Sequence, residues 1–378
     1  MQKIKTGTIT FHASHNYGSM LQAYALQQIL IKELCVENEI INFRSEAQKR
    51  YYQLQDKKNI TLKQKILKLF IGNNDNALEK KFLLFENFLK EELILSQEFN
   101  NEDEVIEYSN KFDYLISGSD QIWNTYCLDF SWLYYLPFAN GNAIAYAPSM
   151  GPDAINKVSA DNYARINESV QRFKSLSVRE QGTSEVIKTI SGLDAEILVD
   201  PTLLLEKAEW ERLAGEEPLI KDDYIFMYHP FVNKEIYRIS KNISKHTGLQ
   251  VIVSNKLFNK AELHNLLTGK HLRYKLDCGP KEFLNLVKNA KYVISGSFHA
   301  VVFSIIFQRP FVALDGIKDN RMSQILKATN LLKYSIDKDN HIQVFKELES
   351  IDFSKSLEYI GNERTRSLAY LKNALRMS

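Results

Sequence analysis

The stretch IKTGTITFHASHNYGSMLQAYALQQIL, residues 4–30, determines the fold class that the sequence predicts. Its first part, Ile4 to Phe11, is rich in threonine and β-branched residues, which is typical of a strand. The polar residues 12–17 predict a loop, and from Gly18 onward apolar residues recur at helical spacing. Residues 39–43 predict the next strand. This strand–loop–helix–strand order is typical of a doubly wound parallel sheet.

The same alternation continues along the chain in two sets. The first set of predicted strands comprises Tyr114–Ser117, Ala143–Ala147, Ser175–Val178 and Ile197–Val199. The second set comprises Tyr224–His229, Gln250–Ser254, Tyr292–Ser295 and Phe311–Leu314, and the polar residues 210–223 are predicted to connect the two sets. The sequence therefore predicts an α/β protein with two Rossmann-like domains that face each other across a cleft. Ligands of such folds bind beyond the carboxyl ends of the strands.

The length of 378 residues also favours two domains, because one hydrophobic core stops growing at roughly 250–300 residues. We predict an N-terminal domain over residues 1–205, with a helical insertion at 46–110, and a C-terminal domain over residues 206–340. A helical tail, residues 341–378, is expected to pack back on the N-terminal domain.

The predicted insertion has segregated charge. Residues 48–68 form a basic block and residues 91–107 an acidic block. Two interpretations remain open for these blocks. They pair with each other as solvated helix faces, or the basic block makes a peripheral contact with a membrane surface or an anionic acceptor.

Composition excludes several classes of protein. Lys and Arg number 48 and Asp and Glu 46, so the net charge is +2, and no nucleic-acid partner is predicted. The three cysteines lie far apart and lack metal-ligand spacing. The sequence also has no paired His motif, so no metal is predicted. No segment resembles a signal peptide or the ~18 apolar residues of a membrane span, so we expect a soluble, cytoplasmic protein. No GxGxxG fingerprint is present, and no cofactor is predicted.

The turn after the first strand holds the first candidate site. Substrate-binding candidates here are Asn16, Tyr17, Gly18 and Ser19. Gly18 allows the backbone to approach a ligand, and the exposed amides of a helix start favour an anion. The alternative is that Asn16 and Ser19 are only turn and cap residues.

Two further candidates follow strands of the first set. In GSDQIWN, residues 118–124, Asp120 is placed to accept a proton or orient a hydroxyl, and Gln121 and Trp123 are candidate substrate contacts, Trp123 by stacking on a sugar. The alternative is a helix cap at Asp120 and a packed Trp123. In SVRE, Arg179 suits bidentate capture of a carboxylate or phosphate, and the alternative is an ion pair with Glu180 or another acid.

The stretch ISGSFHAVVFSIIF, residues 294–307, is the strongest candidate of the second set. A small turn joins an apolar strand to an apolar helix, with His299 in the first helical turn. Such a helix start lowers the pKa of a histidine and offers amides to a phosphate. The alternative is a histidine that caps or packs. Neighbouring candidate substrate contacts are Ser295, Ser297 and Phe298, and, after another strand, Tyr228 and His229.

Taken together, these stretches resemble the polysaccharide pyruvyl transferase family. The matching pieces occur in the family's order from about residue 4 to residue 315 and are TFHASHNYGSMLQAYALQ, SGSDQIWN, AYAPSMG, SVREQG, VDPTLLL and VISGSFHAVVFSIIFQRPFVAL. The resemblance implies a fold like that of B-type glycosyltransferases (GT-B-like), with acceptor binding by the first domain and donor binding by the second. It implies transfer of the enolpyruvyl unit of phosphoenolpyruvate onto two hydroxyls of a sugar, with galactose as the expected acceptor, in bacterial surface polysaccharide (capsule or exopolysaccharide) biosynthesis.

The resemblance also assigns roles. Asp120, Arg179 and the pair Phe298-His299 match donor-site positions. His299 is the expected general acid or base, Asp120 orients or deprotonates the acceptor hydroxyl, and Arg179 holds the donor's carboxylate or phosphate. Several members carry a second Arg where this chain has Ser297. If an Arg is needed there for the phosphate, another cation such as Arg309 or Lys291 must replace it; the alternative is that the donor differs.

Two other functions remain open at this point. One is a glycosyltransferase of the same architecture with a nucleotide-sugar donor, for which Asp315 is a weak candidate ribose contact. The other is a non-catalytic glycan-binding protein of the same fold. The acceptor of the transferase is a sugar that is lipid-linked, nucleotide-linked or polymeric, and a lipid-linked oligosaccharide would place the protein at the inner face of a membrane.

Overall fold

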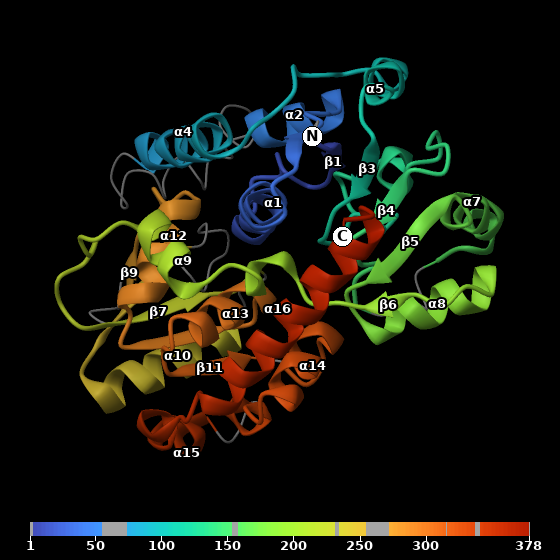
Figure 1. The fold of residues 1–378 in the computed structure, drawn as a ribbon. Coiled ribbons are helices and arrows are strands. Elements are labelled where there is room, and N and C mark those ends of the chain that lie inside the picture. The colour runs from blue at the N-terminus through green and yellow to red at the C-terminus, as the bar shows by residue number, and fades with distance from the viewer. Residues whose placement is uncertain are drawn as a thin grey trace. The chain divides into compact units, whose positions relative to one another are not determined.

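The computed structural model describes residues 3–54, 74–152, 158–230, 234–254, 272–314, 316–336 and 341–377. The chain divides into two compact units. Unit 1 comprises Met1–Tyr52, Leu89–Leu205 and Ile360–Ser378, and unit 2 comprises Gln53–Phe88 and Glu206–Tyr359. Each unit contains a six-stranded sheet with helices around it (Figure 1).

The sheet of unit 1 has the strand order β2-β1-β3-β4-β5-β6, and its strands pair in parallel. The strands are β1 Lys5–Ile9, β2 Glu37–Ile40, β3 Tyr114–Ser117, β4 Ala143–Ala145, β5 Phe173–Val178 and β6 Glu196–Ile197. The helices are α1 Tyr17–Gln28, α2 Glu46–Leu54, α5 Glu102–Ser109, α7 Ala160–Val170 and α8 Gln181–Ser191. Helix α1 continues into a short π-helix at Ile29–Glu33, and 3₁₀ turns follow at Trp132–Tyr135 and Pro201–Leu203.

The sheet of unit 2 has the order β12-β11-β10-β7-β8-β9, again with parallel pairing. Its strands are β7 Tyr224–Tyr228, β8 Gln250–Val253, β9 Leu272–Tyr274, β10 Tyr292–Ser295, β11 Phe311–Leu314 and β12 Ser335–Ile336. Its helices are α9 Lys207–Ala214, α10 Lys234–Thr247, α12 Pro280–Asn289, α13 Phe298–Ile306, α14 Asn320–Ala328 and α15 His341–Lys346, with 3₁₀ turns at Leu332–Tyr334 and Leu348–Ser350. Two longer helices, α4 Asn74–Glu92 and α16 Ser354–Ala374, contribute residues to both units.

The strand order fixes where a ligand can bind. In unit 1, β1 lies between β2 and β3, and in unit 2, β7 lies between β8 and β10. The chain therefore winds in opposite directions from these strands, and the switch point lies between β1 and β3 in unit 1 and between β7 and β10 in unit 2. The loops after β1 and β3, and after β7 and β10, meet at the carboxyl ends beside these switch points. The candidate residues around Asn16, Asp120, His229 and His299 follow these strands.

Short elements differ from the expectation. Strands β9 and β12 were not predicted, because two or three residues carry no readable alternation. The segment expected to be a polar connection instead contains part of α9. That helix forms because Trp210 is buried and its ring meets Phe303 edge to face, with centroids 4.9 Å apart.

The end of the chain joins unit 1. Tyr370, in the part of α16 assigned to unit 1, donates from its hydroxyl to the carbonyl of Ala145 in β4 at 2.7 Å. Arg364 Nε donates to the carbonyl of Leu204 at 2.8 Å. The helical tail thus fastens onto the central sheet of unit 1.

The predicted insertion is divided between the units, although we expected it to belong to the first domain. Residues 53–88 belong to unit 2. Within unit 2, Lys80 of α4 forms a 2.9 Å ion pair with Asp277, and Gly279 lets Leu84 approach so closely that an added Cβ would lie 2.6 Å from the Leu84 Cβ.

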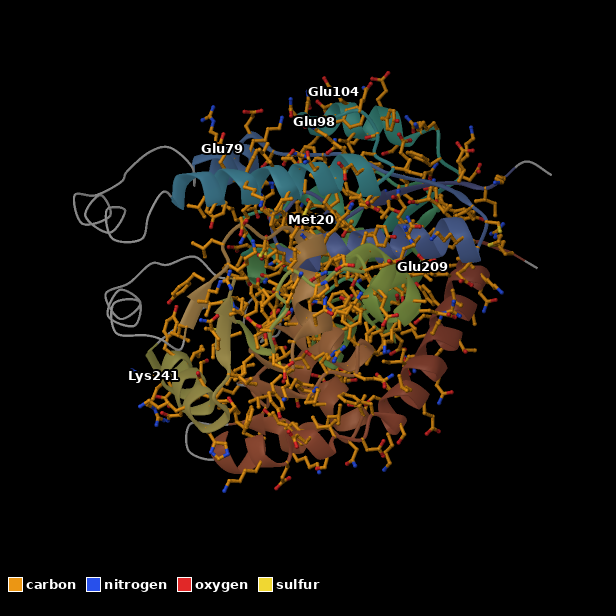
Figure 2. The ribbon with its side chains drawn as sticks, turned by 90° about the vertical axis from the view of Figure 1, so that its left-hand side faces the viewer. Met20, Glu79, Glu98, Glu104, Glu209 and Lys241 are labelled. Carbon is orange, nitrogen blue, oxygen red and sulfur yellow. The ribbon has the colours of Figure 1, made fainter. Side chains whose placement is uncertain are left out.

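Part of the expected pairing between the charged blocks is present in unit 1. Lys49 Nζ lies 2.5 Å from Glu98 Oε1. Glu98 and Glu104 of the acidic block are labelled in Figure 2. The basic residues from Lys57 to Lys68 lie outside the described residues. The Lys49–Glu98 ion pair therefore tests the expected pairing only at the start of the basic block.

Candidate functional site

The side chain of Asn16, in the turn after β1, caps the start of helix α1. Asn16 is the N-cap of α1, and its Oδ1 accepts hydrogen bonds from the amides of Gly18 at 2.9 Å and Ser19 at 3.4 Å. Tyr17 is buried. These amides are therefore engaged by Asn16, which corresponds to the capping alternative for this turn.

Asp120 connects the segments that follow the neighbouring strands β1 and β3 of unit 1. Its Oδ2 accepts a 2.5 Å hydrogen bond from the hydroxyl of Ser19 at the start of α1. The backbone of Asp120 has φ +73°, a left-handed conformation that Asp tolerates better than most side chains. The carboxylate is buried where the loop after β3 meets the loop after β1.

Arg179 follows β5 and is surrounded by carboxylates. Its Nη1 lies 2.8 Å from Asp200 Oδ2 and 3.7 Å from Asp120 Oδ1. Its Nε lies 3.6 Å from Glu180 Oε2, and the side chain is 2% exposed. Burial alone would lower the pKa of Arg179, but the three carboxylates outweigh burial and raise it. The guanidinium therefore stays charged, and its charge is compensated within unit 1.

Asp200 is a member of this cluster that sequence reasoning missed. Its Oδ1 accepts hydrogen bonds from the amide of Thr202 at 3.0 Å and from the Thr202 hydroxyl at 2.8 Å, while Oδ2 faces Arg179. The signal was present as the Asp-Pro-Thr sequence directly after a strand. Only the fold shows that Arg179 is the partner.

Trp123 packs in the core of unit 1 and does not face a ligand. It is 1% exposed and stacks on Tyr135, with ring centroids 4.8 Å apart and planes at 10°. Its Nε1 donates to the Ser117 hydroxyl and to the carbonyl of Tyr134, both at 3.2 Å. The sugar-stacking interpretation of Trp123 is therefore corrected, because the ring is buried, stacks on Tyr135 and has its polar tip bonded within the core.

Gln121 is half-buried next to Gly151, which has φ +83°. An added Cβ at Gly151 would lie 2.5 Å from Gln121 Oε1, so glycine makes room for this amide. Gln121 Oε1 also accepts a 3.1 Å hydrogen bond from Asn124. The amide lies beside the Asp120 loop, with its oxygen held in place.

In unit 2, the strand ends of β7 and β10 are tied together. The Ser295 hydroxyl donates to the carbonyl of Tyr228 at 2.5 Å and accepts from the amide of Ser297 at 3.0 Å. The His229 ring lies directly over Gly296, where an added Cβ would lie 2.2 Å from it. Glycine is therefore needed at Gly296 for this histidine to occupy its position.

His299 lies in the first turn of α13, close to the same strand ends. Its ring meets Phe298 edge to face, with centroids 5.2 Å apart. Arg321 of α14 places its guanidinium 5.7 Å from the centroid of the Phe298 ring and forms a 2.7 Å ion pair with Asp319. Sequence reasoning missed Arg321, because only the fold brings α14 beside Phe298.

The cations considered in place of an Arg at Ser297 lie elsewhere. Lys291 precedes β10 and pairs with Asp223, which precedes β7, at 3.1 Å. Arg309 precedes β11. Both are at the amino ends of the parallel strands, whereas Ser297 and His299 follow a carboxyl end. Asp315 lies outside the described residues.

Two features are absent from the described part of the chain. No group of three or more His, Cys, Asp or Glu side chains there is arranged to hold a metal ion. Within that same part, no helix combines the length and apolar character needed to cross a membrane.

Comparisons with known proteins agree on the fold and identify a family. A family model described as "Polysaccharide pyruvyl transferase" matches residues 16–316. No curated protein matches in sequence. Among solved structures, the chain is similar to a putative UDP-N-acetylglucosamine 2-epimerase from Listeria monocytogenes, with TM-score 0.58, 12% identity and coverage of 98% of this chain and 96% of that chain. It is also similar to the UDP-GlcNAc 2-epimerase from Neisseria meningitidis, with TM-score 0.54, 11% identity and coverage of 98% and 100%. These likenesses show a GT-B-like fold.

Proposed function

Because the chain belongs to the polysaccharide pyruvyl transferase family and is therefore a transferase enzyme, we propose that it transfers the enolpyruvyl unit of phosphoenolpyruvate to a sugar. The product is a cyclic ketal on two hydroxyls. The observation that carries this proposal is the placement of His299 at the carboxyl end of β10, beside a switch point and inside the matched range. We propose that the enzyme works in the cytoplasm on a surface-polysaccharide precursor, with a galactose-containing, lipid-linked oligosaccharide as the expected acceptor.

The reaction requires proton transfers and stabilised charge, with no change in oxidation state. A proton is added to the methylene carbon of the donor, and a sugar hydroxyl attacks the neighbouring carbon. Phosphate then leaves, and a second hydroxyl closes the ring. Of the two hydroxyl protons lost, one balances the proton gained by the methyl group and the other leaves with phosphate. A histidine is suited to the first transfer, since its pKa lies near neutral pH.

We assign that transfer to His299. Its ring is buried next to Phe298, and a buried imidazole is held in one orientation by packing. His229 and Ser295 come from the two strand ends beside it and are proposed to contact the donor. Ser297, Phe298 and Tyr228 complete the proposed donor contacts.

Arg321 is proposed as the cation that replaces the missing Arg at Ser297. Phosphoenolpyruvate carries a phosphate and a carboxylate, and a guanidinium binds such groups in two-pronged fashion. Arg321 lies against Phe298, whereas Arg309 and Lys291 lie at the amino ends of the strands. Its ion pair with Asp319 holds the guanidinium in position.

For Arg179 the geometry favours a positioning role over donor capture. Its charge is already compensated by Asp200, Glu180 and Asp120. We propose that Arg179, 3.7 Å from Asp120 Oδ1, holds the Asp120 side chain in the orientation in which it can receive a proton from the acceptor. Asn16 through Ser19, with Gln121, are proposed to line the acceptor side around it.

The test is an assay of the purified protein with a panel of sugar acceptors and either phosphoenolpyruvate or nucleotide sugars. The proposal is supported if the protein releases inorganic phosphate and forms a ketal product with phosphoenolpyruvate as the donor, and is inactive with nucleotide sugars. Release of nucleotide indicates a glycosyltransferase, and sugar binding without either release indicates a glycan-binding protein.

The assay needs one catalytic variant and one matched control. His299→Ala is expected to lower phosphate release by at least about 100-fold, the range of general acid–base catalysis. His246→Ala, at an exposed position of α10, removes the same group away from the strand ends and is expected to retain activity. Near wild-type turnover in His299→Ala would refute its assigned role.

A further inference from the structure

A second carboxylate, Asp129, lies farther along the loop that carries Asp120. Its Oδ2 accepts a hydrogen bond from the Ser14 hydroxyl at 2.5 Å and another from the Tyr52 hydroxyl at 2.8 Å. Ser14 follows β1, Tyr52 belongs to α2, which follows β2, and Asp129 follows β3. Because β2, β1 and β3 are neighbours in a parallel sheet, segments that follow three adjacent strands converge on this carboxylate.

The two carboxylates of this loop are held in the same way. Ser19 donates to Asp120 Oδ2 at 2.5 Å, as Ser14 does to Asp129 Oδ2. Both serines belong to the short segment between β1 and the first turn of α1. One rigid segment therefore fixes both carboxylates at the same edge of the sheet.

The surroundings of Asp129 suit a sugar. Its Oδ1 is buried and accepts no hydrogen bond from any residue that the structure describes, a situation that costs about 1–3 kcal/mol unless a donor arrives. The His15 ring stacks on Tyr52 with centroids 4.7 Å apart, and Tyr126, in the same loop as Asp129, is 67% exposed. An exposed aromatic side chain three residues from a hydrogen-bond acceptor suits the apolar C–H face and the hydroxyls of a sugar ring.

We propose that Asp129 binds one of the two acceptor hydroxyls that react, while Asp120 receives the other. This inference rests on the proposed function, because a cyclic ketal consumes two hydroxyls of one sugar. Each hydroxyl loses its proton when its oxygen bonds to the donor carbon. The protons leave through the two carboxylates, and in the overall balance one is taken up as the methyl group forms and one by the departing phosphate.

The protonation behaviour of Asp129 agrees with this role. Burial raises the pKa of its carboxyl, and the charge of Asp120 raises it further, while hydrogen bonds from Ser14 and Tyr52 and the charge of His15 oppose the shift. The net effect is a raised pKa. A carboxyl whose pKa moves toward neutral pH takes up and returns a proton more readily during turnover.

The test measures binding of methyl β-galactopyranoside and its 4-deoxy and 6-deoxy analogues by ligand-detected NMR titration. Asp129→Asn replaces a charged acceptor with a neutral amide and is expected to weaken binding of the parent sugar by about tenfold, because hydrogen bonds to charged groups are the stronger ones. Wild type and Asp129→Asn should bind one of the two deoxy analogues with equal affinity, because that analogue lacks the hydroxyl that contacts residue 129. Tyr52→Phe, which removes only a hydroxyl, should weaken binding in the same pattern by a smaller factor.

Asp194→Asn is the matched control, because it makes the same change at a side chain that is 87% exposed. Equal loss in the control, unchanged binding in Asp129→Asn and Tyr52→Phe, or no binding of any of the three sugars by the wild type would each overturn the proposal. Binding requires no turnover, so the two proposals can fail separately. Sugar binding that depends on Asp129 without pyruvyl transfer refutes the function alone. Pyruvyl transfer with the same acceptor KM in wild type and Asp129→Asn refutes the subsite alone.

Discussion

Arg179 Nη1 lies 2.8 Å from Asp200 Oδ2, and both side chains are shielded from solvent inside unit 1. Two more carboxylates, Glu180 and Asp120, share the same guanidinium. Three carboxylates thus share one cation, so losing the cation should cost more stability than losing one of the acids.

Arg179→Met is expected to lower the free energy of unfolding by about 3–5 kcal/mol, because buried carboxylates remain without their cation. Asp200→Asn should cost less, since Arg179 keeps two partners. Denaturant unfolding measures both. Arg172→Met, which removes an exposed i,i+4 partner of Glu168, is the control and should change stability by less than about 1 kcal/mol. A greater loss in Asp200→Asn than in Arg179→Met would contradict this description of the cluster.

Gly296→Ala should displace His229, since the new Cβ would lie 2.2 Å from its ring. We expect phosphate release to fall by at least about tenfold, as a misplaced contact near the reacting groups does. Gly182→Ala, in α8, is the control because nothing lies within 4 Å of its added Cβ. Its activity should be unchanged, and its melting temperature unchanged or raised. Full activity in Gly296→Ala would show that His229 is not needed where it lies.

Asp319 gives a pH-dependent prediction. Burial alone would raise its pKa, but the charge and hydrogen bonds of Arg321 and the amide of Met322 outweigh burial and lower the pKa below 3.8. A lowered pKa means that Asp319 stabilises the fold above pH 3.8 and loses this contribution as the pH falls through its lowered value. The stability difference between wild type and Asp319→Asn, measured by denaturant unfolding, should therefore be constant at pH 5–7 and shrink below pH 3.8. A difference that grows on acidification would contradict the assignment.

Trp123 distinguishes a core residue from a sugar contact. Trp123→Ala should lower the free energy of unfolding by about 3–5 kcal/mol, the cost of removing a large buried aromatic side chain. Trp123→Phe keeps a ring against Tyr135 and should leave the acceptor KM unchanged while reducing stability. An increased acceptor KM at unchanged stability in Trp123→Phe would restore the sugar-stacking interpretation.

The sequence was most informative where an apolar run ends in small or polar residues. The bounds of β3, β10 and β11 agree with the prediction, and the buried helix after β10 begins at Phe298 as expected. Strand ends can be predicted because the residue types change from apolar to small or polar over one or two positions where a strand ends. The placement of Asp120 and His299 after strands followed from the same reasoning.

What the sequence did not show depends on contacts between distant segments. Asp200 as partner of Arg179, Arg321 beside Phe298, and Ser14 with Tyr52 on Asp129 each require the sheet order. The direction in which Trp123 points is likewise set by its partners in the core. Residue type and position after a strand were therefore enough to suggest candidate site residues. Tertiary packing was needed to tell which of them have structural contacts.

Helix α1 is buried from Tyr17 through Gln27, with side chains packed around it on all sides. Its backbone amides can exchange with solvent only when unit 1 opens as a whole, so they should be among its slowest in hydrogen-exchange measurements. Ser14 and Ser19, which orient the two carboxylates, are anchored to this segment. The acceptor side is thus preorganised before any sugar arrives, and a bound sugar, which stabilises the folded unit, should slow the exchange of the α1 amides further.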